Sequence, residues 1–274
     1  MTLVSIVQMN SQDDIEANIK VIESLIIEAK SDGASLIVFP ENFVCFAAGK
    51  QLETAERFQE FQQRLQQFAH TYQIWIVAGT LPCPFRPDGT RVPEGRVRTT
   101  SLCISPERTE ARYDKIHLFD VQVGDAVGGY QESKFFEPGD DVVVARTPFG
   151  HIGLMVCYDL RFPELALKLR QHGANILTAP SAFTYTTGQM HWQLLLQARA
   201  MDSQCQVLGA AQQGWHGTKR QTWGHSSATN SRGQLLNMVN AEGAQLITVA
   251  FDLNEQAEIR ESMPLMQHRK LITL

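Results

Sequence analysis

The sequence has no paired cysteine motif and no recognisable metal-binding cluster. Its five cysteines, at positions 45, 83, 103, 157 and 205, form no C-x-x-C pair, and their odd number leaves one without a partner. The eight histidines are scattered, and none lies in an H-E-x-x-H motif. These absences argue against a disulfide framework, a cysteine zinc site and a catalytic metal. We expect neither a metal nor another cofactor.

Long apolar runs and blocks of basic residues are also missing. No apolar stretch approaches the roughly 20 residues that a membrane-spanning helix needs. The first ten residues, MTLVSIVQMN, lack the basic and apolar regions of a signal peptide. The net charge of −5 and a pI near 5.9 argue against a nucleic-acid surface. We expect a cytoplasmic protein whose partners are small molecules, with no nucleic acid and no membrane.

What the chain does contain is ample material for a core, because 43% of its 274 residues are hydrophobic. No linker divides it, so one domain over residues 1–274 is expected. Strands are predicted at 3–9, 35–39, 74–78, 99–105, 110–113, 142–146, 151–156, 175–179, 206–211, 225–229, 234–239 and 245–251. Amphipathic helices are predicted after Asp13 or Asp14, from about Leu52 to Phe68, from about Pro163, and over 189–203.

The order of these elements predicts the fold class. Each half of the chain alternates strands with helices and then turns to hairpins, which indicates two similar mixed sheets. Packing these sheets face to face with helices outside gives a four-layer α-β-β-α sandwich, an α/β fold in a single domain. A doubly wound single sheet is the main alternative. Pro82 to Gly95 is expected to be a loop, and Gly124 to Gly129 a flexible loop over a site rather than a nucleotide cradle.

Cys157 ends an apolar run abruptly, in the stretch HIGLMVCYDLRFPEL that starts at His151. Pro163 suits the first turn of a helix, where its missing N–H has no effect on helical hydrogen bonding. Cys157 is therefore expected in a strand-to-helix turn, where backbone N–H groups favour a thiolate or an oxyanion. The alternative is a cysteine that serves as a small buried hydrophobe.

Two more apolar strands end in residues with useful chemistry. Glu41 follows SLIVFP, and Lys115 follows EARYD. In α/β proteins ligands bind outside the carboxyl ends of the strands, so these two side chains and Cys157 are expected to converge. Taken singly, a glutamate or a lysine in such a place is most often an ordinary solvated charge.

Several segments resemble the nitrilase, or carbon–nitrogen hydrolase, superfamily. The three most specific are FPEN (39–42), YDKIHLFD (113–120) and CYDLRFPEL (157–165). The resemblance continues through YQES (130–133), the long segment from Pro180 to Cys205, WGHS (223–226) and EIR (258–260). The PSAF, ARA and QC elements and the QHRK tail (267–270) are most similar to the branch that hydrolyses deaminated glutathione. The omega-amidase branch, which acts on alpha-ketoglutaramate or alpha-ketosuccinamate, stays open, as does another amide or N-carbamoyl hydrolase.

The resemblance implies a Glu-Lys-Cys triad of Glu41, Lys115 and Cys157, with a second glutamate at Glu132. A thiol is only slightly ionised at neutral pH and needs a base beside it, and Glu41 is the expected base. Cys157 then attacks an amide carbonyl, Lys115 and the backbone N–H of Tyr158 stabilise the oxyanion, and ammonia leaves. Water activated by Glu41 hydrolyses the resulting thioester. Glu132 is expected to hold Lys115 or the amide nitrogen; otherwise it is an ordinary loop glutamate.

By the same resemblance, the substrate-binding candidates are Tyr158, Arg161, Phe183 and Thr187. Deaminated glutathione has two carboxylates, so cations should line the mouth of the site. Arg161 has an equally good alternative role, an ion pair with Asp159 or Glu164 that anchors the turn. The superfamily commonly forms dimers, which implies a homodimer that uses part of this turn and the helix after it.

Three rival functions remain open from the sequence. Gly224 to Ala228, GHSSA, approximates the G-x-S-x-G motif of serine hydrolases, but it ends in alanine and leads into a hairpin rather than a helix. A redox-sensing cysteine protein would need a resolving thiol near Cys157. A binding module that had kept the fold without the activity would release no product from amides.

Overall fold

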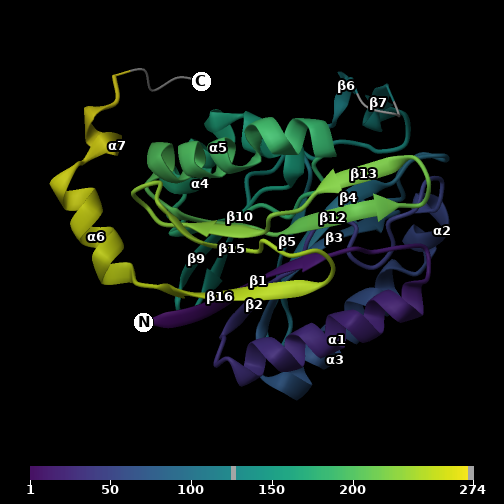
Figure 1. Ribbon diagram of the computed structural model, residues 1–274, viewed down its shortest axis with the longest axis horizontal. Coiled ribbons are helices and arrows are strands. Elements are labelled where there is room, and N and C mark those ends of the chain that lie inside the picture. Colours follow the sequence, from purple (N-terminus) through teal and green to yellow (C-terminus); the bar gives the residue numbers. More distant parts are fainter. Residues whose placement is uncertain (125–127, 271–274) are drawn as a thin grey trace.

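Two β-sheets lie face to face in the computed structural model, which describes residues 1–124 and 128–270 (Figure 1). In this part of the chain the larger sheet has eight strands, in the order β13-β12-β1-β2-β3-β4-β5, with β16 also beside β1. Its strands are β1 (Thr2–Met9), β2 (Leu36–Val38), β3 (Trp75–Cys83), β4 (Arg98–Ile104), β5 (Thr109–Asp114), β12 (Ala211–His216), β13 (Arg220–Trp223) and β16 (Gln245–Phe251).

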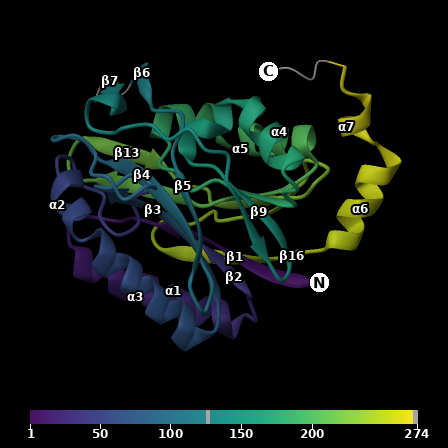
Figure 2. The same ribbon diagram turned by 180° about the vertical axis from the view of Figure 1, so that it is seen from behind.

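The second sheet has six strands among the described residues, in the order β15-β14-β11-β10-β9-β8. These are β8 (Val144–Thr147), β9 (Gly150–Leu154), β10 (Ile176–Thr178), β11 (Gln206–Gly209), β14 (Ser227–Thr229) and β15 (Leu235–Met238). A separate short hairpin joins β6 (Asp120–Gln122) to β7 (Gly129–Gln131). This hairpin lies at one end of the sandwich (Figure 2).

Helices cover both outer faces of the pair of sheets. On the side of the larger sheet are α1 (Ile15–Ser31) and α3 (Phe58–Tyr72), with the short α2 (Gln51–Glu56) before α3; on the other side are α4 (Pro163–Gln171) and α5 (Tyr185–Ser203). The last two helices, α6 (Leu253–Ser262) and α7 (Leu265–His268), lie at the end of the molecule away from β6 and β7. The layers therefore run α-β-β-α, which confirms the predicted sandwich. The doubly wound alternative is wrong. None of the helices in the described part of the chain is long and apolar enough to cross a membrane.

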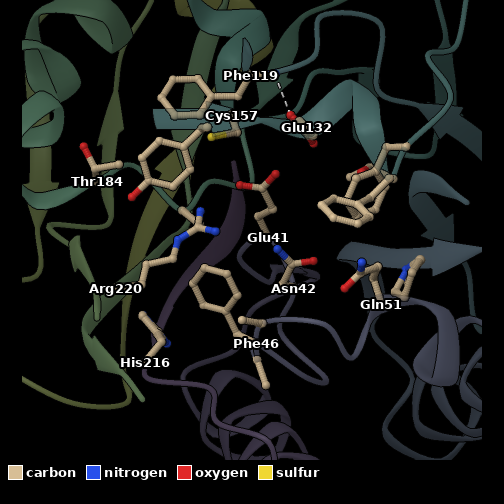
Figure 3. A pocket seen from close by; sticks show the side chains of 18 of the residues that line it. Glu41, Asn42, Phe46, Gln51, Phe119, Glu132, Cys157, Thr184, His216 and Arg220 are labelled. Atoms are coloured by element: carbon tan, nitrogen blue, oxygen red, sulfur yellow. Dashed lines mark hydrogen bonds between the residues drawn. The ribbon is translucent and has the colours of Figure 1, made fainter. Parts of the chain in front are cut away.

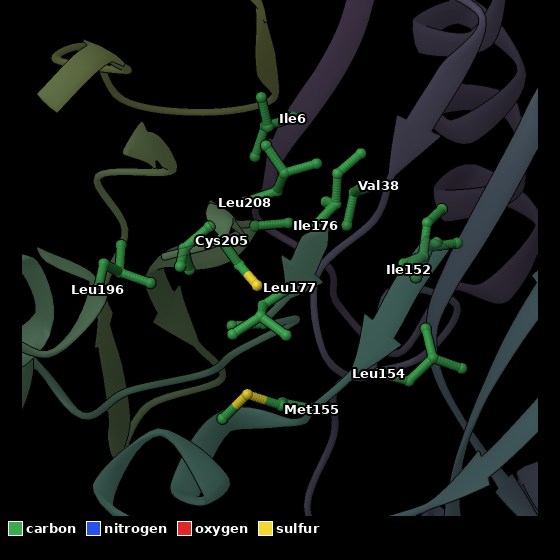
Figure 4. Packing of buried hydrophobic residues seen from close by; sticks show 14 of the residues in the cluster. Ile6, Val38, Ile152, Leu154, Met155, Ile176, Leu177, Leu196, Cys205 and Leu208 are labelled. Atoms are coloured by element: carbon green, nitrogen blue, oxygen red, sulfur yellow. The ribbon is translucent and has the colours of Figure 1, made fainter. Parts of the chain in front are cut away.

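Alternate residues of each central strand point to opposite sides of the sheet, and both sides are buried. In β1, Val4 and Ile6 pack between the two sheets, whereas Val7 and Met9 pack under α1 and α3. Figure 4 shows Ile6 among apolar side chains of the second sheet. Each such side chain that is fully removed from water contributes roughly 1.5–3 kcal/mol. This two-sided burial explains the continuous apolar runs in the sequence.

The two halves of the chain exchange strands, which the sequence reading did not foresee. The predicted strand 206–211 is divided at Ala210: β11 pairs with β10 in the second sheet, and β12 pairs with β1 in the first. Seven residues of β16 pair with β1 in antiparallel register, from Thr2↔Phe251 to Gln8↔Gln245. Hydropathy shows that these segments are buried strands, but it carries no information about which sheet they join.

Smaller differences have local causes. The predicted helix over 189–203 starts earlier, at Tyr185, because the Thr184 side chain caps it by accepting from the Thr187 N–H. The predicted helix from Leu52 is two helices, α2 and α3, that meet at Arg57. The expected loop over 82–95 begins later than predicted, since β3 extends to Cys83. Residues 125–127, within the expected glycine-rich loop, lie outside the described residues. The helix after Asp14 forms as predicted, with Asp14 as its cap.

Candidate functional site

Cys157 lies in the strand-to-helix connection where the sequence places it. The strand β9 ends at Leu154, and a single 3-10 segment, η2 (Cys157–Arg161), precedes α4. Cys157 has a φ of 49°, a left-handed conformation that is rare for any residue with a side chain. Its N–H donates to the Pro180 carbonyl at 2.9 Å. The turn therefore holds the sulfur in one direction, toward a pocket.

The Asp159 side chain holds this turn in place through hydrogen bonds. It is fully buried and accepts four hydrogen bonds: from the Tyr113 hydroxyl at 2.6 Å, the Val156 N–H at 2.9 Å, the His117 N–H at 3.1 Å, and His117 Nδ1 at 2.7 Å. Tyr113 and His117 flank Lys115 in the chain. Asp159 thus ties the cysteine turn of one sheet to the lysine segment of the other.

Replacing Asp159 with asparagine should therefore reduce both stability and turnover. An amide keeps the shape but replaces one acceptor oxygen by an NH₂ group, which faces donors. We expect the free energy of unfolding to fall by roughly 2–3 kcal/mol and kcat to fall about 10- to 100-fold as Cys157 loses its alignment. Urea denaturation and steady-state kinetics measure the two effects. The exposed Asp141→Asn is the matched control, and equal behaviour of the two variants would contradict this role.

Glu41 follows β2 on a tightly held segment of backbone. The Gln212 side chain on β12 donates to the Glu41 carbonyl at 3.0 Å, and the Asn42 N–H donates to Thr80 Oγ1 at 2.9 Å. Gly79 of β3 lies so close that an added Cβ would be 1.9 Å from the Pro40 carbonyl oxygen. Only glycine fits there, and this close approach sets the direction in which Glu41 leaves the strand.

Lys115 is the centre of the site. Its Nζ lies 3.1 Å from Glu41 Oε1 and 3.0 and 2.9 Å from the two carboxylate oxygens of Glu132. Glu132 begins the short 3-10 segment η1 (Glu132–Lys134) and also accepts from the Phe119 N–H at 2.6 Å. Burial disfavours the ammonium form, but the charges of Glu132 and Glu41 outweigh it and raise the pKa of Lys115 well above its usual value. Lys115 is therefore a permanent cation between two carboxylates.

Cys157 completes the group, and Figure 3 shows its sulfur beside Glu41 and Glu132. The Glu41 and Cys157 side chains line the same pocket, where Figure 3 shows the carboxylate near the sulfur. Burial first, and then the negative charge of Glu41, raise the pKa of Cys157 above that of an ordinary thiol, against the opposing effects of Lys115 and of the Ala182 N–H. The expectation that the helix start favours a thiolate is therefore wrong for the resting protein. The sulfur is protonated until a base removes its proton.

The four residues lie at the wall of a pocket with a volume of about 730 Å³. All four substrate-binding candidates, Tyr158, Arg161, Phe183 and Thr187, also line it. The Arg161 guanidinium lies over the rings of Tyr158 and Phe183, at 6.0 and 5.6 Å from their centroids, and 3.3 Å from the His191 ring nitrogen. Among the described residues it has no ion pair, so the alternative of a pair with Asp159 or Glu164 is wrong.

Comparison with known proteins assigns the family. The sequence profile of the carbon-nitrogen hydrolases matches residues 3–261. The chain belongs to this family. It is 38% identical to the deaminated glutathione amidase of Yersinia enterocolitica, over 98% of this chain and 93% of that protein. It is 36% identical to the deaminated glutathione amidase of Synechocystis sp. (strain PCC 6803 / GT-S), over 98% of both chains.

A solved structure agrees with the fold of this carbon–nitrogen hydrolase. The crystal structure of Saccharomyces cerevisiae Nit3, described as a member of branch 10 of the nitrilase superfamily, superposes with a TM-score of 0.85 at 27% identity. The match covers 98% of this chain and 96% of that one. The predicted resemblance to the nitrilase superfamily is therefore confirmed over nearly the whole chain, and the protein is a hydrolase that acts on carbon–nitrogen bonds.

In this hydrolase Ser226, the candidate nucleophile of the alternative serine-hydrolase hypothesis, has a structural role. Ser226 is fully buried, and its hydroxyl donates to the Val7 carbonyl at 3.0 Å and accepts from the Ala211 N–H at 2.8 Å. It is not among the residues that line the pocket. Its bonds join β1 to β12 near the point where the chain passes from one sheet to the other. The G-x-S-x-G reading is therefore wrong.

Several pocket residues were missed by sequence reasoning. Arg220 on β13 lies over the rings of Phe46 and Tyr130, at 4.5 and 5.3 Å from their centroids. His216 packs against Phe46 with ring centroids 4.2 Å apart. Burial and the nearby Arg220 lower the pKa of His216 to about 4, so this ring is neutral at pH 7. Nothing in the local sequence marks these residues, because they reach the pocket only through the β12–β13 hairpin that was not predicted.

An ionic network behind Lys115 holds its strand and the segment after it together. Glu137 accepts from Arg86 Nε at 2.8 Å and from Arg98 Nη2 at 2.6 Å, and Arg98 Nη1 donates to Asp114 at 3.0 Å. The hydrogen bonds from Arg86 lower the pKa of Glu137 most, burial opposes them, and Arg98 adds to the decrease, so the pKa falls to about 2. The network thus links β4, β5 and the segment that follows Glu132.

The depressed pKa of Glu137 predicts an acid-labile share of stability. A carboxylate whose pKa is lower in the folded than in the unfolded protein stabilises the fold fully above the unfolded value, and this contribution disappears as the pH falls toward the folded value. For Glu137 this window lies between pH 4.5 and about 2, and the share is on the order of 2–3 kcal/mol. Glu137→Gln should be less stable than wild type at pH 7, with the difference shrinking across this window. Urea titrations at several pH values measure it, and a constant difference would contradict the assignment.

Proposed function

We propose that this carbon–nitrogen hydrolase cleaves the amide bond of deaminated glutathione through a cysteine thioester. The supporting observation is the contact of Glu41, Lys115 and Cys157 in one pocket, in a chain whose full-length relatives at 36–38% identity bear the name deaminated glutathione amidase. The pocket is large enough for a ligand of tripeptide size. In this proposal residues 1–274 form one catalytic domain that needs no metal or other cofactor.

The first half of the reaction forms the thioester. Glu41 takes the proton of Cys157 as the sulfur attacks the amide carbonyl carbon, and the carbonyl oxygen becomes an oxyanion. Lys115 has three N–H donors; if the two Glu132 oxygens share one of them and Glu41 takes a second, the third is available to this oxygen. The backbone N–H of Tyr158 is the second donor. Removing one such donor typically slows catalysis by a factor of about 10² to 10³.

The second half releases both products. Protonated Glu41 gives its proton to the amide nitrogen, the carbon–nitrogen bond breaks, and the amine leaves. Glu41 then takes a proton from water, which attacks the thioester carbon and frees the acid and the thiol. Glu132 keeps Lys115 in place through both of its oxygens. Glu132 has a positioning role, since its carboxylate accepts hydrogen bonds from Lys115 and from the Phe119 N–H.

The chemistry of deaminated glutathione changes the expected leaving group. This compound is glutathione with a keto group in place of its free amino group, so its scissile amide joins a five-carbon oxo acid to cysteinylglycine. The departing nitrogen is therefore the amine of cysteinylglycine. Ammonia leaves only from primary amides such as alpha-ketoglutaramate. Arg161, above Tyr158 and Phe183, and the Thr187 hydroxyl are the groups we assign to the oxo-acid part.

A product assay tests the proposal and separates it from the omega-amidase alternative. The purified protein is given deaminated glutathione, alpha-ketoglutaramate, an N-carbamoyl amino acid and a simple nitrile, and released cysteinylglycine or ammonia is measured. We expect the highest kcat/KM for deaminated glutathione and no measurable turnover with Cys157→Ala. A higher value for alpha-ketoglutaramate would make the protein an omega-amidase. Turnover of only nitriles or carbamoyl compounds would overturn the assignment.

We also propose a homodimer and a cytoplasmic location. The outer face of α5 exposes Met190, Leu194 and Met201, which are 58%, 65% and 56% accessible and lie on one side of the helix by their spacing. An apolar stripe of this kind is typical of an interface. Sedimentation velocity should show a dimer, and Leu194→Glu a monomer. The five cysteines are all free thiols, as is usual in a reducing compartment.

A further inference from the structure

Arg220, like Arg161, is an arginine that lines the pocket, and among the described residues no carboxylate pairs with it. In Figure 3 its side chain reaches into the pocket beside Phe46. Its Nε is sealed from solvent and has no hydrogen-bond partner, and among the described residues the guanidinium forms no ion pair and no hydrogen bond. The two terminal nitrogens remain accessible to the pocket. Arg220 is thus held by aromatic rings, with its donors directed at the space where a ligand binds.

Among the residues that the structure describes, no carboxylate is bound to Arg220. His216 faces it across the β12–β13 hairpin and is neutral at pH 7. Three carboxylates line the pocket: Glu41 and Glu132 are both bound to Lys115, and Asp13 is exposed and forms no ion pair with Arg220. Arg98, by contrast, is buried between two carboxylates, Asp114 and Glu137. A half-buried guanidinium without a carboxylate retains its full capacity to bind an anion in a bidentate manner.

The two pocket arginines that form no ion pair come from different sheets. Arg161 belongs to η2, directly after the second sheet, and Arg220 begins β13 of the first sheet. A ligand that carries one carboxylate on each side of its scissile amide has an anionic group for each of these two arginines. Deaminated glutathione has one carboxylate next to its keto group and another on its glycine residue. Alpha-ketoglutaramate has only the first.

We propose that Arg220 binds the glycine carboxylate of deaminated glutathione and so selects substrates whose leaving group ends in an anion. This inference rests on the proposed function and makes Arg220 its specificity-determining residue. The Phe46 and Tyr130 rings keep the guanidinium plane in place, so little side-chain freedom is lost on binding. Lys219 also lines the pocket, but its side chain is exposed and adds attraction rather than a fixed contact.

Kinetics with three substrates test the proposal. These are deaminated glutathione, the same compound with its glycine carboxylate converted to an amide, and alpha-ketoglutaramate. With wild type, the amidated compound should have a kcat/KM about 10- to 100-fold below that of deaminated glutathione. Arg220→Gln should lower kcat/KM for deaminated glutathione by the same factor, chiefly through KM, and change the other two substrates less than about threefold. Arg220→Lys should fall between, and the exposed Arg146→Gln is the charge-matched control.

The outcomes separate this inference from the function on which it rests. Equal losses for all three substrates in Arg220→Gln would overturn it, because they would indicate a structural or general electrostatic role. An unchanged preference for the free carboxylate would overturn it as well. In both cases turnover by wild type leaves the proposed function standing. If wild type cleaves neither deaminated glutathione nor its amidated form, both proposals fail. Circular dichroism and thermal melting establish that each variant is folded.

Discussion

Replacing Glu41 with glutamine is expected to lower kcat by about a thousandfold or more while the protein stays folded. Glutamine keeps the size of the side chain and an oxygen that can accept from Lys115, which lies 3.1 Å away. It cannot take a proton from sulfur. Because burial and the charge of Glu41 raise the pKa of Cys157, the resting thiol is protonated and depends on this carboxylate for its activation.

The same substitution should make the thiol easier to ionise in the absence of substrate. The negative charge of Glu41 raises the pKa of Cys157, whereas Lys115 lowers it. With Glu41 neutral, the effect of Lys115 remains and the pKa of Cys157 falls. Alkylation of Cys157 by iodoacetamide should therefore reach its maximal rate at a lower pH in Glu41→Gln than in wild type. The exposed Glu28→Gln serves as control.

These two measurements together identify the role of Glu41. In Glu41→Gln, turnover must fall. At a pH below the plateau of the profile, the rate of Cys157 alkylation must rise, because a larger fraction of the thiol is ionised. A variant that keeps more than a tenth of wild-type kcat would show that another group removes the proton. An alkylation profile that moves to higher pH would show that Glu41 does not act on Cys157 through its charge.

Replacing Lys115 with methionine should abolish turnover and destabilise the fold. Methionine has a similar length but no charge, so Glu41 and Glu132 are left as two buried carboxylates without a cation between them. Removing one partner of a buried ion pair typically lowers the free energy of unfolding by about 3–5 kcal/mol. The oxyanion also loses its main donor, so kcat should fall by a factor of at least about 10³.

A second substitution separates the two effects of losing Lys115. Adding Glu132→Gln to Lys115→Met removes one of the uncompensated charges and should restore part of the stability in urea, without restoring turnover. Lys115 has a pKa raised above its ordinary value, so its contribution is complete below about pH 10.4 and is lost only as the pH rises further. The destabilisation should therefore be full at pH 7. A double variant no more stable than Lys115→Met would contradict the ion-pair explanation.

The positions of the reactive residues were predictable because they follow strand ends. Glu41 and Cys157 come soon after short apolar runs that form the strands β2 and β9, and Lys115 comes directly after β5, whose last two residues are buried. The end of a strand can be read from the sequence, because the change from apolar to polar residues is local. That three such ends meet in one pocket follows from the stacking of two sheets.

Features that depend on long-range pairing were not predictable in the same way. Arg220 reaches the pocket because the chain passes from β11 in the second sheet to β12, which pairs with β1 in the first sheet and with β13. No local sequence pattern predicts this change of sheet. Asp159 was considered as a partner for Arg161, but its acceptors are taken by Tyr113 and His117 from the other sheet. The pKa of Cys157 likewise depends on how deeply the turn is buried, which the sequence does not reveal.

The pairing of β1 with β16 has a consequence for synthesis on the ribosome. Residues 2–9 are made before residues 245–251, the antiparallel neighbour of one of their edges. A growing polypeptide therefore carries an open, apolar strand edge while the more than 230 residues between the two strands are translated, and such an edge is the kind of surface that recruits chaperones or pairs with other chains. Completion of the larger sheet has to wait until the C-terminal part has left the exit tunnel.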